Sequence, residues 1–71
     1  MKNPPVPYEV TSTFEGREYR GSYIIVSQMI KVTSSYGSKS TQIGGSLPEV
    51  TARRLLHQIL LDAKRKGLLS Q

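Results

Sequence analysis

The residues that could do acid–base or metal chemistry are few and scattered in this sequence. The carboxylates are Glu9, Glu15, Glu18, Glu49 and Asp62, and the only histidine is His57; cysteine is absent. One histidine without a second nitrogen or sulfur ligand does not make a metal site. Glu49 and Arg53, and Asp62 and Lys66, stand four residues apart, as in helical ion pairs. No serine, histidine and acid form a nucleophilic motif, so we expect a protein that is not an enzyme and has no cofactor or metal.

A segment rich in glycine and hydroxyl residues, from Tyr36 to Ser46, has the most distinctive local composition. Its start is similar to the end of a phosphate-binding loop, but that motif needs an adjoining Gly-Lys pair and a helix directly after it, whereas Lys39 follows a serine and leads into a predicted strand. We therefore exclude a P-loop. The anion-binding candidates are the residues just before the predicted helix: Gly44, Gly45 and Ser46. A plain strand-to-helix corner with a capping serine explains them better.

Composition points to a small basic protein with partners. Ten Lys and Arg against five Asp and Glu give a net charge of +5, which favours polyanions such as nucleic acid. A chain of 71 residues buries only about 60% of its unfolded surface, so its size favours a further contact surface such as a homodimer. The longest apolar runs are too short for a membrane span, and the N-terminus lacks the apolar core of a signal peptide. We expect a cytoplasmic protein without a membrane partner.

The stretch from Ser46 to Gly67 predicts a helix, and the preceding residues are expected to form the surface on which that helix packs. Ser46 and Glu49 suggest a capping box with Pro48 in the first turn, and Gly67 suits a left-handed helix end. Apolar residues spaced three and four apart form one core-facing stripe: Ala52, Leu55, Leu56, Ile59, Leu60 and Ala63. The stripe requires a surface to pack on.

The preceding residues predict that surface as a four-stranded antiparallel meander. After a Pro-rich tail at residues 1–7, period-two alternation begins at Tyr8. We expect strands at about 8–14, 17–26, 29–36 and 39–44, with turns at Glu15-Gly16, Ser27-Gln28 and Gly37-Ser38. These turns set Ile25 opposite Ile30, Tyr23 opposite Val32 and Val32 opposite Ile43, and Gly21 leaves room for a ring or the helix. Residues 8–71 are thus expected to form one two-layer α+β domain, ββββα, with all the aromatic residues on its core face.

The outward face of this sheet is the candidate nucleic-acid surface. Its cations and hydroxyl donors are Arg20, Lys31, Ser22, Thr33 and Ser35, joined by Lys39 at the third turn. The absence of aromatic residues opposes single-strand binding, since single-strand binders stack bases on rings. A plain solvated sheet face is the favoured alternative.

Two apolar groups fall outside the predicted core and are candidate interfaces. The first, at the second hairpin, is Ile24, Val26 and Met29; the second, on the helix side away from the core, is Val50 and Leu61 with His57. Either group suits a protein contact such as a homodimer. Single exposed apolar residues are also normal on protein surfaces.

Several short motifs resemble a family of short bacterial proteins of uncharacterised function. They are Gly21-Ser22-Tyr23, Tyr36-Gly37-Ser38-Lys39, Thr41-Gln42, Gly44-Gly45, Pro48-Glu49, Ala52-Arg53 and Leu55-Leu56. This resemblance implies no activity. In topology alone, four strands and a C-terminal helix are similar to the positive-cofactor type of transcriptional coactivator, which binds single-stranded DNA as a dimer. We therefore predict a small basic binding module for single-stranded nucleic acid, with a protein-interaction adaptor or an anion or small-ligand binder as alternatives.

Overall fold

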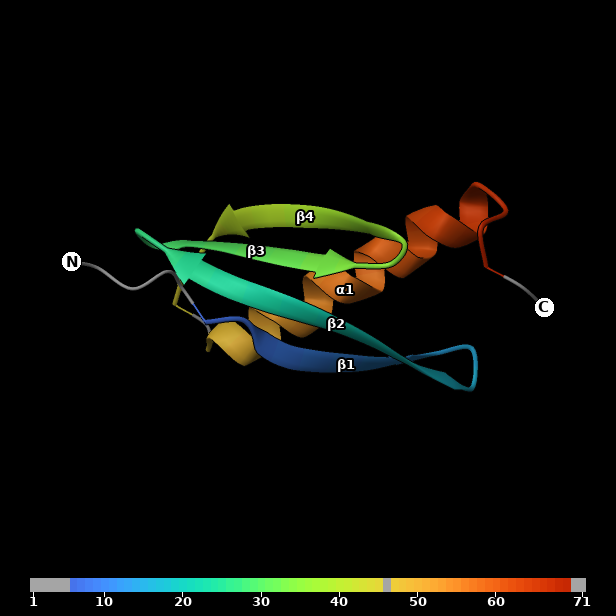
Figure 1. Cartoon of the computed structure of the whole chain (residues 1–71), viewed down its shortest axis with the longest axis horizontal. Coiled ribbons are helices and arrows are strands. Elements are labelled where there is room, and N and C mark those ends of the chain that lie inside the picture. The colour runs from blue at the N-terminus through green and yellow to red at the C-terminus, as the bar shows by residue number, and fades with distance from the viewer. Residues whose placement is uncertain (1–5, 46, 70–71) are drawn as a thin grey trace.

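Four strands and one helix follow one another in the structure, a computed structural model that describes residues 6–45 and 47–69. The elements are β1 (Tyr8–Phe14), β2 (Arg17–Val26), β3 (Met29–Ser34), β4 (Gly37–Gln42) and α1 (Pro48–Arg65). Neighbouring strands pair antiparallel in the order β1-β2-β3-β4, and α1 packs against one face of the sheet (Figure 1). The predicted ββββα fold is confirmed. No helix in these described ranges is long and apolar enough to cross a bilayer.

The first two hairpins form as predicted. Their turns are Glu15-Gly16, with φ of 53° and 81°, and Ser27-Gln28, with φ of 49° and 66°. Two successive residues with positive φ are the conformation whose twist suits a two-residue hairpin. The resulting registers, including Ile25 opposite Ile30, place the predicted apolar residues on one face.

The third turn differs from the prediction, which placed it at Gly37-Ser38. β3 ends at Ser34, and the turn residues are Ser35 and Tyr36. The Ser34 hydroxyl accepts a hydrogen bond from the Tyr36 N–H at 3.1 Å and donates one to the Gly37 carbonyl at 3.3 Å. The side chain of Ser34 thus stabilises a turn two residues earlier than the glycine suggested.

The earlier turn changes the register between β3 and β4. Val32 pairs with Lys39, and not with Ile43 as predicted, which is a displacement of four residues along β4. Side chains alternate between faces with a period of two, so an even displacement keeps every residue on its predicted face. The face assignment was therefore right although the register was wrong.

The core lies between the sheet and α1. Its buried apolar residues are Val10, Phe14, Ile30, Val32, Ala52, Leu55, Leu56, Ile59, Leu60 and Ala63. All six predicted helix positions are among them, and burial of each leucine or isoleucine contributes about 1.5 to 3 kcal/mol. At Gly21 the helix comes close to the sheet: Leu56 Cδ1 is 3.3 Å from the position that a β-carbon would take. The room predicted at Gly21 is occupied by the helix.

The aromatic residues divide between the core and its border. Phe14 is buried, whereas Tyr8 and Tyr36 are exposed because one begins the edge strand and the other lies in a turn. Tyr8 stacks on the partly buried Tyr23 at 5.4 Å between ring centroids, and Tyr36 meets the partly buried Tyr19 edge-on at 5.8 Å. The prediction that all the aromatic residues lie on the core face is confirmed for Tyr8, Phe14, Tyr19 and Tyr23, although Tyr8 is exposed there, and it is wrong for Tyr36, which lies in the third turn.

The N-terminal end of α1 differs from the prediction, whereas its C-terminal end agrees with it. The N-cap residue is Leu47, without a side-chain hydrogen bond, so the predicted capping box does not begin this helix; Ser46 lies outside the described residues. At the other end Gly67 has φ of 77°, and the Leu68 N–H donates to the Ala63 carbonyl at 2.8 Å. This is the glycine-terminated helix end that the sequence predicted.

Candidate functional site

The outer face of the sheet, the predicted nucleic-acid surface, carries balanced charge. Arg20 lies 3.8 Å from the Glu9 carboxylate, and both side chains are mostly exposed. Glu18 and Lys31 lie on the same face, because both alternate with core-facing neighbours along their strands. The negative charge of Glu18 offsets the positive charge of Lys31. The structure places Ser22 directly opposite Thr33 on this face, as predicted. The face is thus polar without a net positive charge among its four charged residues.

Lys39 does not join Arg20 and Lys31, because it lies on the opposite face of the sheet. It pairs with the buried Val32, and its ammonium is 3.3 Å from the Asp62 carboxylate of α1. Asp62 also lies 3.9 Å from Arg65, and it pairs with these two cations rather than with Lys66 as predicted. Ser35 is exposed in the third turn. The predicted six-residue group is therefore split, with Lys39 bound to the helix.

Positive charge is concentrated on the helix. Residues 48–66 carry five basic and two acidic side chains, a net charge of +3 out of +5 for the chain. Arg53 pairs with Glu49 at 2.9 Å, and Lys64 pairs with Glu15 of the first turn. Among the described residues, no carboxylate lies within ion-pairing distance of Arg54.

A stripe of four exposed residues runs along the helix opposite its core-facing side, and we name it the basic ridge. Its members, spaced three and four apart, are Arg54, Gln58, Leu61 and Arg65. The two arginines stand eleven residues apart, which is about 16 Å along a helix. Both cations therefore lie on one solvent-facing surface.

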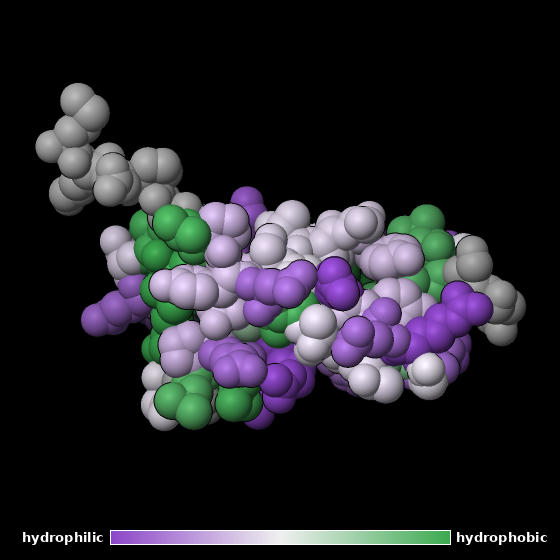
Figure 2. All heavy atoms as spheres, turned by 60° about the horizontal axis from the view of Figure 1, so that its bottom comes forward, coloured by the Kyte–Doolittle hydropathy of each residue, from purple (hydrophilic) through white to green (hydrophobic). Residues whose placement is uncertain are grey.

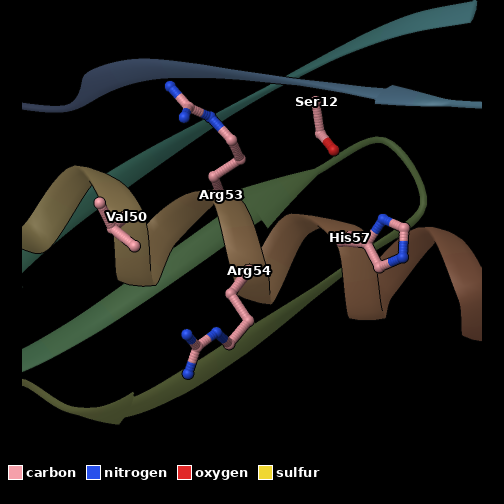
Figure 3. A pocket seen from close by; sticks show the side chains of 5 residues that line it. All are labelled: Ser12, Val50, Arg53, Arg54 and His57. Atoms are coloured by element: carbon pink, nitrogen blue, oxygen red, sulfur yellow. The ribbon is translucent and has the colours of Figure 1, made fainter. Parts of the chain in front are cut away.

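A groove of about 360 Å³, which we name the β1–α1 groove, separates β1 from the helix (Figure 3). Its lining residues are Ser12, Val50, Arg53, Arg54 and His57. Ser12 is only 7% exposed and occupies a core-facing position between two large residues, Val10 and Phe14, so its small side chain leaves room. The Ser12 hydroxyl points into this space, and Arg53 extends toward β1 while Arg54 turns away from it (Figure 3).

His57 belongs to this groove rather than to a helix surface shared with Leu61. Its ring meets Phe14 edge-on at 5.4 Å between centroids, although the residue is exposed. The prediction placed His57 on the side of the helix away from the core and did not identify the groove. The available signal was a serine in the otherwise apolar alternation of the first strand.

Most of the described exposed apolar residues lie at one end of the molecule, which we name the apolar end and which lies on the left in Figure 2. They are Val6, Tyr8, Ile25, Val26, Met29, Leu47 and Val50. Val26 is 49% and Met29 41% exposed, whereas Ile24 is half-buried. The β2–β3 turn and the start of α1 lie at this end (Figure 1). Leu61 stands eleven residues beyond Val50, about 16 Å along the helix, and does not join it.

The predicted anion-binding corner is only partly described. Gly44 and Gly45 are exposed, and Ser46 lies outside the described residues. No group of three or more His, Cys, Asp or Glu side chains within residues 6–45 and 47–69 is placed to hold a metal ion. The anion corner stays a prediction.

Comparisons of the chain with protein-family models, with curated proteins and with solved structures gave no match. The class that the structure defines is a small ββββα domain of the α+β type with one basic helix.

Proposed function

We propose that the chain is a small non-enzymatic module that binds nucleic acid through the basic ridge of α1. The observation that supports this proposal is the location of the charge: +3 of the net +5 belongs to residues 48–66, and the outer sheet face is balanced. Arg54 and Arg65 reach along about 16 Å of helix, which spans several phosphates of a nucleic-acid strand. The binding surface therefore differs from the sheet face predicted from the sequence.

The arginine side chains of the basic ridge contact phosphates, and phosphate contacts carry little base specificity. The guanidinium groups of Arg54 and Arg65 are planar and can each donate two hydrogen bonds to the oxygens of one phosphate. The basic ridge contains no aromatic residue on which bases could stack, and stacking is what favours single strands. We expect weak, nearly sequence-independent binding, without a preference for single strands over duplexes.

The deciding experiment is a titration of labelled single-stranded and duplex oligonucleotides at low salt, with two double variants. Arg54→Ala with Arg65→Ala removes two charges from the helix, and Arg20→Ala with Lys31→Ala removes two charges from the sheet. If the basic ridge binds, the helix variant loses at least about tenfold in affinity and the sheet variant less than about threefold. The opposite ranking would assign binding to the sheet. Absence of binding by the unaltered protein would remove nucleic acid as the ligand.

A second candidate function, a protein contact that includes a homodimer, is favoured by the apolar end. Seven exposed apolar side chains lie at one end of a small domain, and such a concentration of apolar surface is typical of a contact site. The patch involves neither Arg54 nor Arg65, so this function is compatible with nucleic-acid binding. A dimer through this end would present two basic ridges to one nucleic acid.

A further inference from the structure

β1 is an edge strand with free hydrogen-bonding groups along its outer side. Among residues 6–45 and 47–69 it pairs only with β2, and its pair nearest the turn is Phe14 with Arg17. In a two-residue hairpin this closing pair exchanges both hydrogen bonds, and pairs with and without such bonds then alternate. The N–H and C=O groups of Glu9, Thr11 and Thr13 therefore point away from β2. Six backbone groups are available to a further strand.

This edge has few of the features that normally prevent strand addition. Between Tyr8 and Phe14 there is no lysine, no proline and no bulge in the pairing with β2, and Glu9 is the one charged residue. The opposite edge, β4, carries Lys39 and is tied to the helix through Asp62. Long regular edges without such protection are templates for pairing with another chain.

The β1–α1 groove lies beside this edge and is bordered by a basic row on the helix. Arg53, His57 and Lys64 follow one another at spacings of four and seven residues on the side of α1 that faces β1. Lys64 is already paired with Glu15 of the adjoining turn. Arg53 is paired with Glu49, but both groups are more than half exposed, and exposed pairs of this kind contribute little to stability. Arg53 can therefore exchange its partner for another carboxylate at little cost.

We propose that β1 and the β1–α1 groove bind an extended acidic peptide as a fifth strand of the sheet. Its backbone pairs with the outward groups of Glu9, Thr11 and Thr13. Alternate side chains of the added strand then project toward α1, because side chains alternate along a strand. Carboxylates at these positions meet Arg53 and His57, and the Ser12 hydroxyl offers a further polar contact. Main-chain bonds supply affinity in this mode, and the basic row supplies the selection for acidic side chains.

Two other occupants fit the same place less well. A second copy paired through its own β1 would contribute only Glu9 as an acid, on the outer sheet face, and the two-fold axis would bring two basic helices together. A nucleic acid offers phosphate acceptors but no regular donors for the three free carbonyl groups. An acidic peptide satisfies both the backbone donors and the backbone acceptors of this edge. The proposal does not depend on nucleic-acid binding, since it uses neither Arg54 nor Arg65 as a contact.

The test uses a blocked peptide of about seven residues, the length of β1, with glutamate and valine alternating. Two matched peptides accompany it: one with lysine in place of glutamate, and one with alternate backbone nitrogens methylated so that they cannot donate. Titrations are followed by NMR of the intact protein. We expect the acidic peptide to bind weakly, in the range of about 0.1 to 1 mM, to shift the signals of β1 and His57, and to slow amide exchange at Thr11 and Thr13. The lysine and N-methyl peptides should bind at least about tenfold more weakly.

Protein variants provide the second arm. Thr11→Pro removes an outward N–H on β1, and Ser40→Pro removes the corresponding outward N–H on the other edge strand, β4; proline is tolerated at such edge positions. Thr11→Pro and Arg53→Gln should each lower the affinity for the acidic peptide by about three- to tenfold, and Ser40→Pro should lower it by less than about twofold. If Thr11→Pro fails to fold, the N-methyl peptide on the unaltered protein decides the question.

Four results would overturn the proposal. They are equal binding of the lysine peptide, equal binding of the N-methyl peptide, signal shifts outside β1 and the β1–α1 groove, and no binding at about 1 mM. Protection of the Thr11 and Thr13 amides that grows with protein concentration in the absence of peptide would assign the edge to a second copy instead.

Discussion

Leu56 of α1 rests on Gly21 of β2, with its Cδ1 atom 3.3 Å from the position of a β-carbon on that glycine. The carbonyl oxygen of Thr33 lies 3.0 Å from the same position. A side chain at residue 21 would therefore push against the adjoining strand and the helix together. This contact sets the separation between the two layers at the centre of the domain.

We expect Gly21→Ala to destabilise the fold by about 1 to 3 kcal/mol, since overpacking a tight core forces neighbouring atoms to move. The backbone of Thr33 cannot move without disturbing its pair with Ser22, so relaxation must come from Leu56. Urea unfolding gives the free energy. Gly44→Ala is the matched control, because its added β-carbon meets nothing within 4 Å, and it should change stability by less than about 1 kcal/mol. Equal effects of the two substitutions would show that Gly21 is not a packing site.

The helix stripe gives a second prediction. Leu56 and Ile59 are 0% and 3% exposed, and replacing either by alanine should cost about 2 to 5 kcal/mol through lost burial and a cavity. Leu61→Ala, on the exposed basic ridge, is the control and should cost less than about 1 kcal/mol. Denaturant unfolding of the three variants provides the comparison. Similar losses at Leu56 and Leu61 would mean that the helix presents a different face to the sheet.

The sequence predicted the faces of the sheet better than its registers. The first two turns stand at the residues expected from Gly16 and from the polar pair Ser27-Gln28. At the third turn Gly37 was the misleading residue, because the turn is stabilised by the Ser34 side chain, a weaker and more general signal. Moving a two-residue turn by two positions displaces the pairing by four residues. Because four is even, the strand residues stay on their predicted faces.

The candidate sites were less predictable because they depend on contacts between distant segments. Lys39 was expected to join the sheet-face cations from the third turn, but its pairing with Asp62, twenty-three residues away, holds it against the helix. The β1–α1 groove depends on Ser12 and His57 from different elements, and neither residue indicates it alone. Charge balance on the outer face likewise follows from Glu9 lying across the strand pair from Arg20.

A homodimer through the apolar end gives the third prediction. If that end dimerises, Met29→Asp should raise the dissociation constant at least about tenfold, because a charge buried in the contact has no partner. Leu61→Asp makes the same change of charge on the helix, at a residue of nearly equal exposure, 40% against 41%, and should leave the dimer intact. Sedimentation velocity over a range of concentrations measures both. A protein that stays monomeric at high micromolar concentration would exclude this dimer.

The salt dependence of oligonucleotide binding gives the last prediction and tests the basic ridge directly. The two cations of the basic ridge, Arg54 and Arg65, displace counterions from about two phosphates. The slope of log affinity against log salt should then be roughly −1.4 for a single strand and roughly −1.8 for a duplex. Arg54→Ala with Arg65→Ala should bring both slopes close to zero, because no cation of the basic ridge remains. Arg20→Ala with Lys31→Ala lowers the net charge equally and should leave the slopes unchanged, since these residues lie on the far face of the sheet from the helix. A fall in slope with the sheet variant alone would place the phosphates on the sheet, and an equal fall with both would show that binding follows net charge and no particular surface.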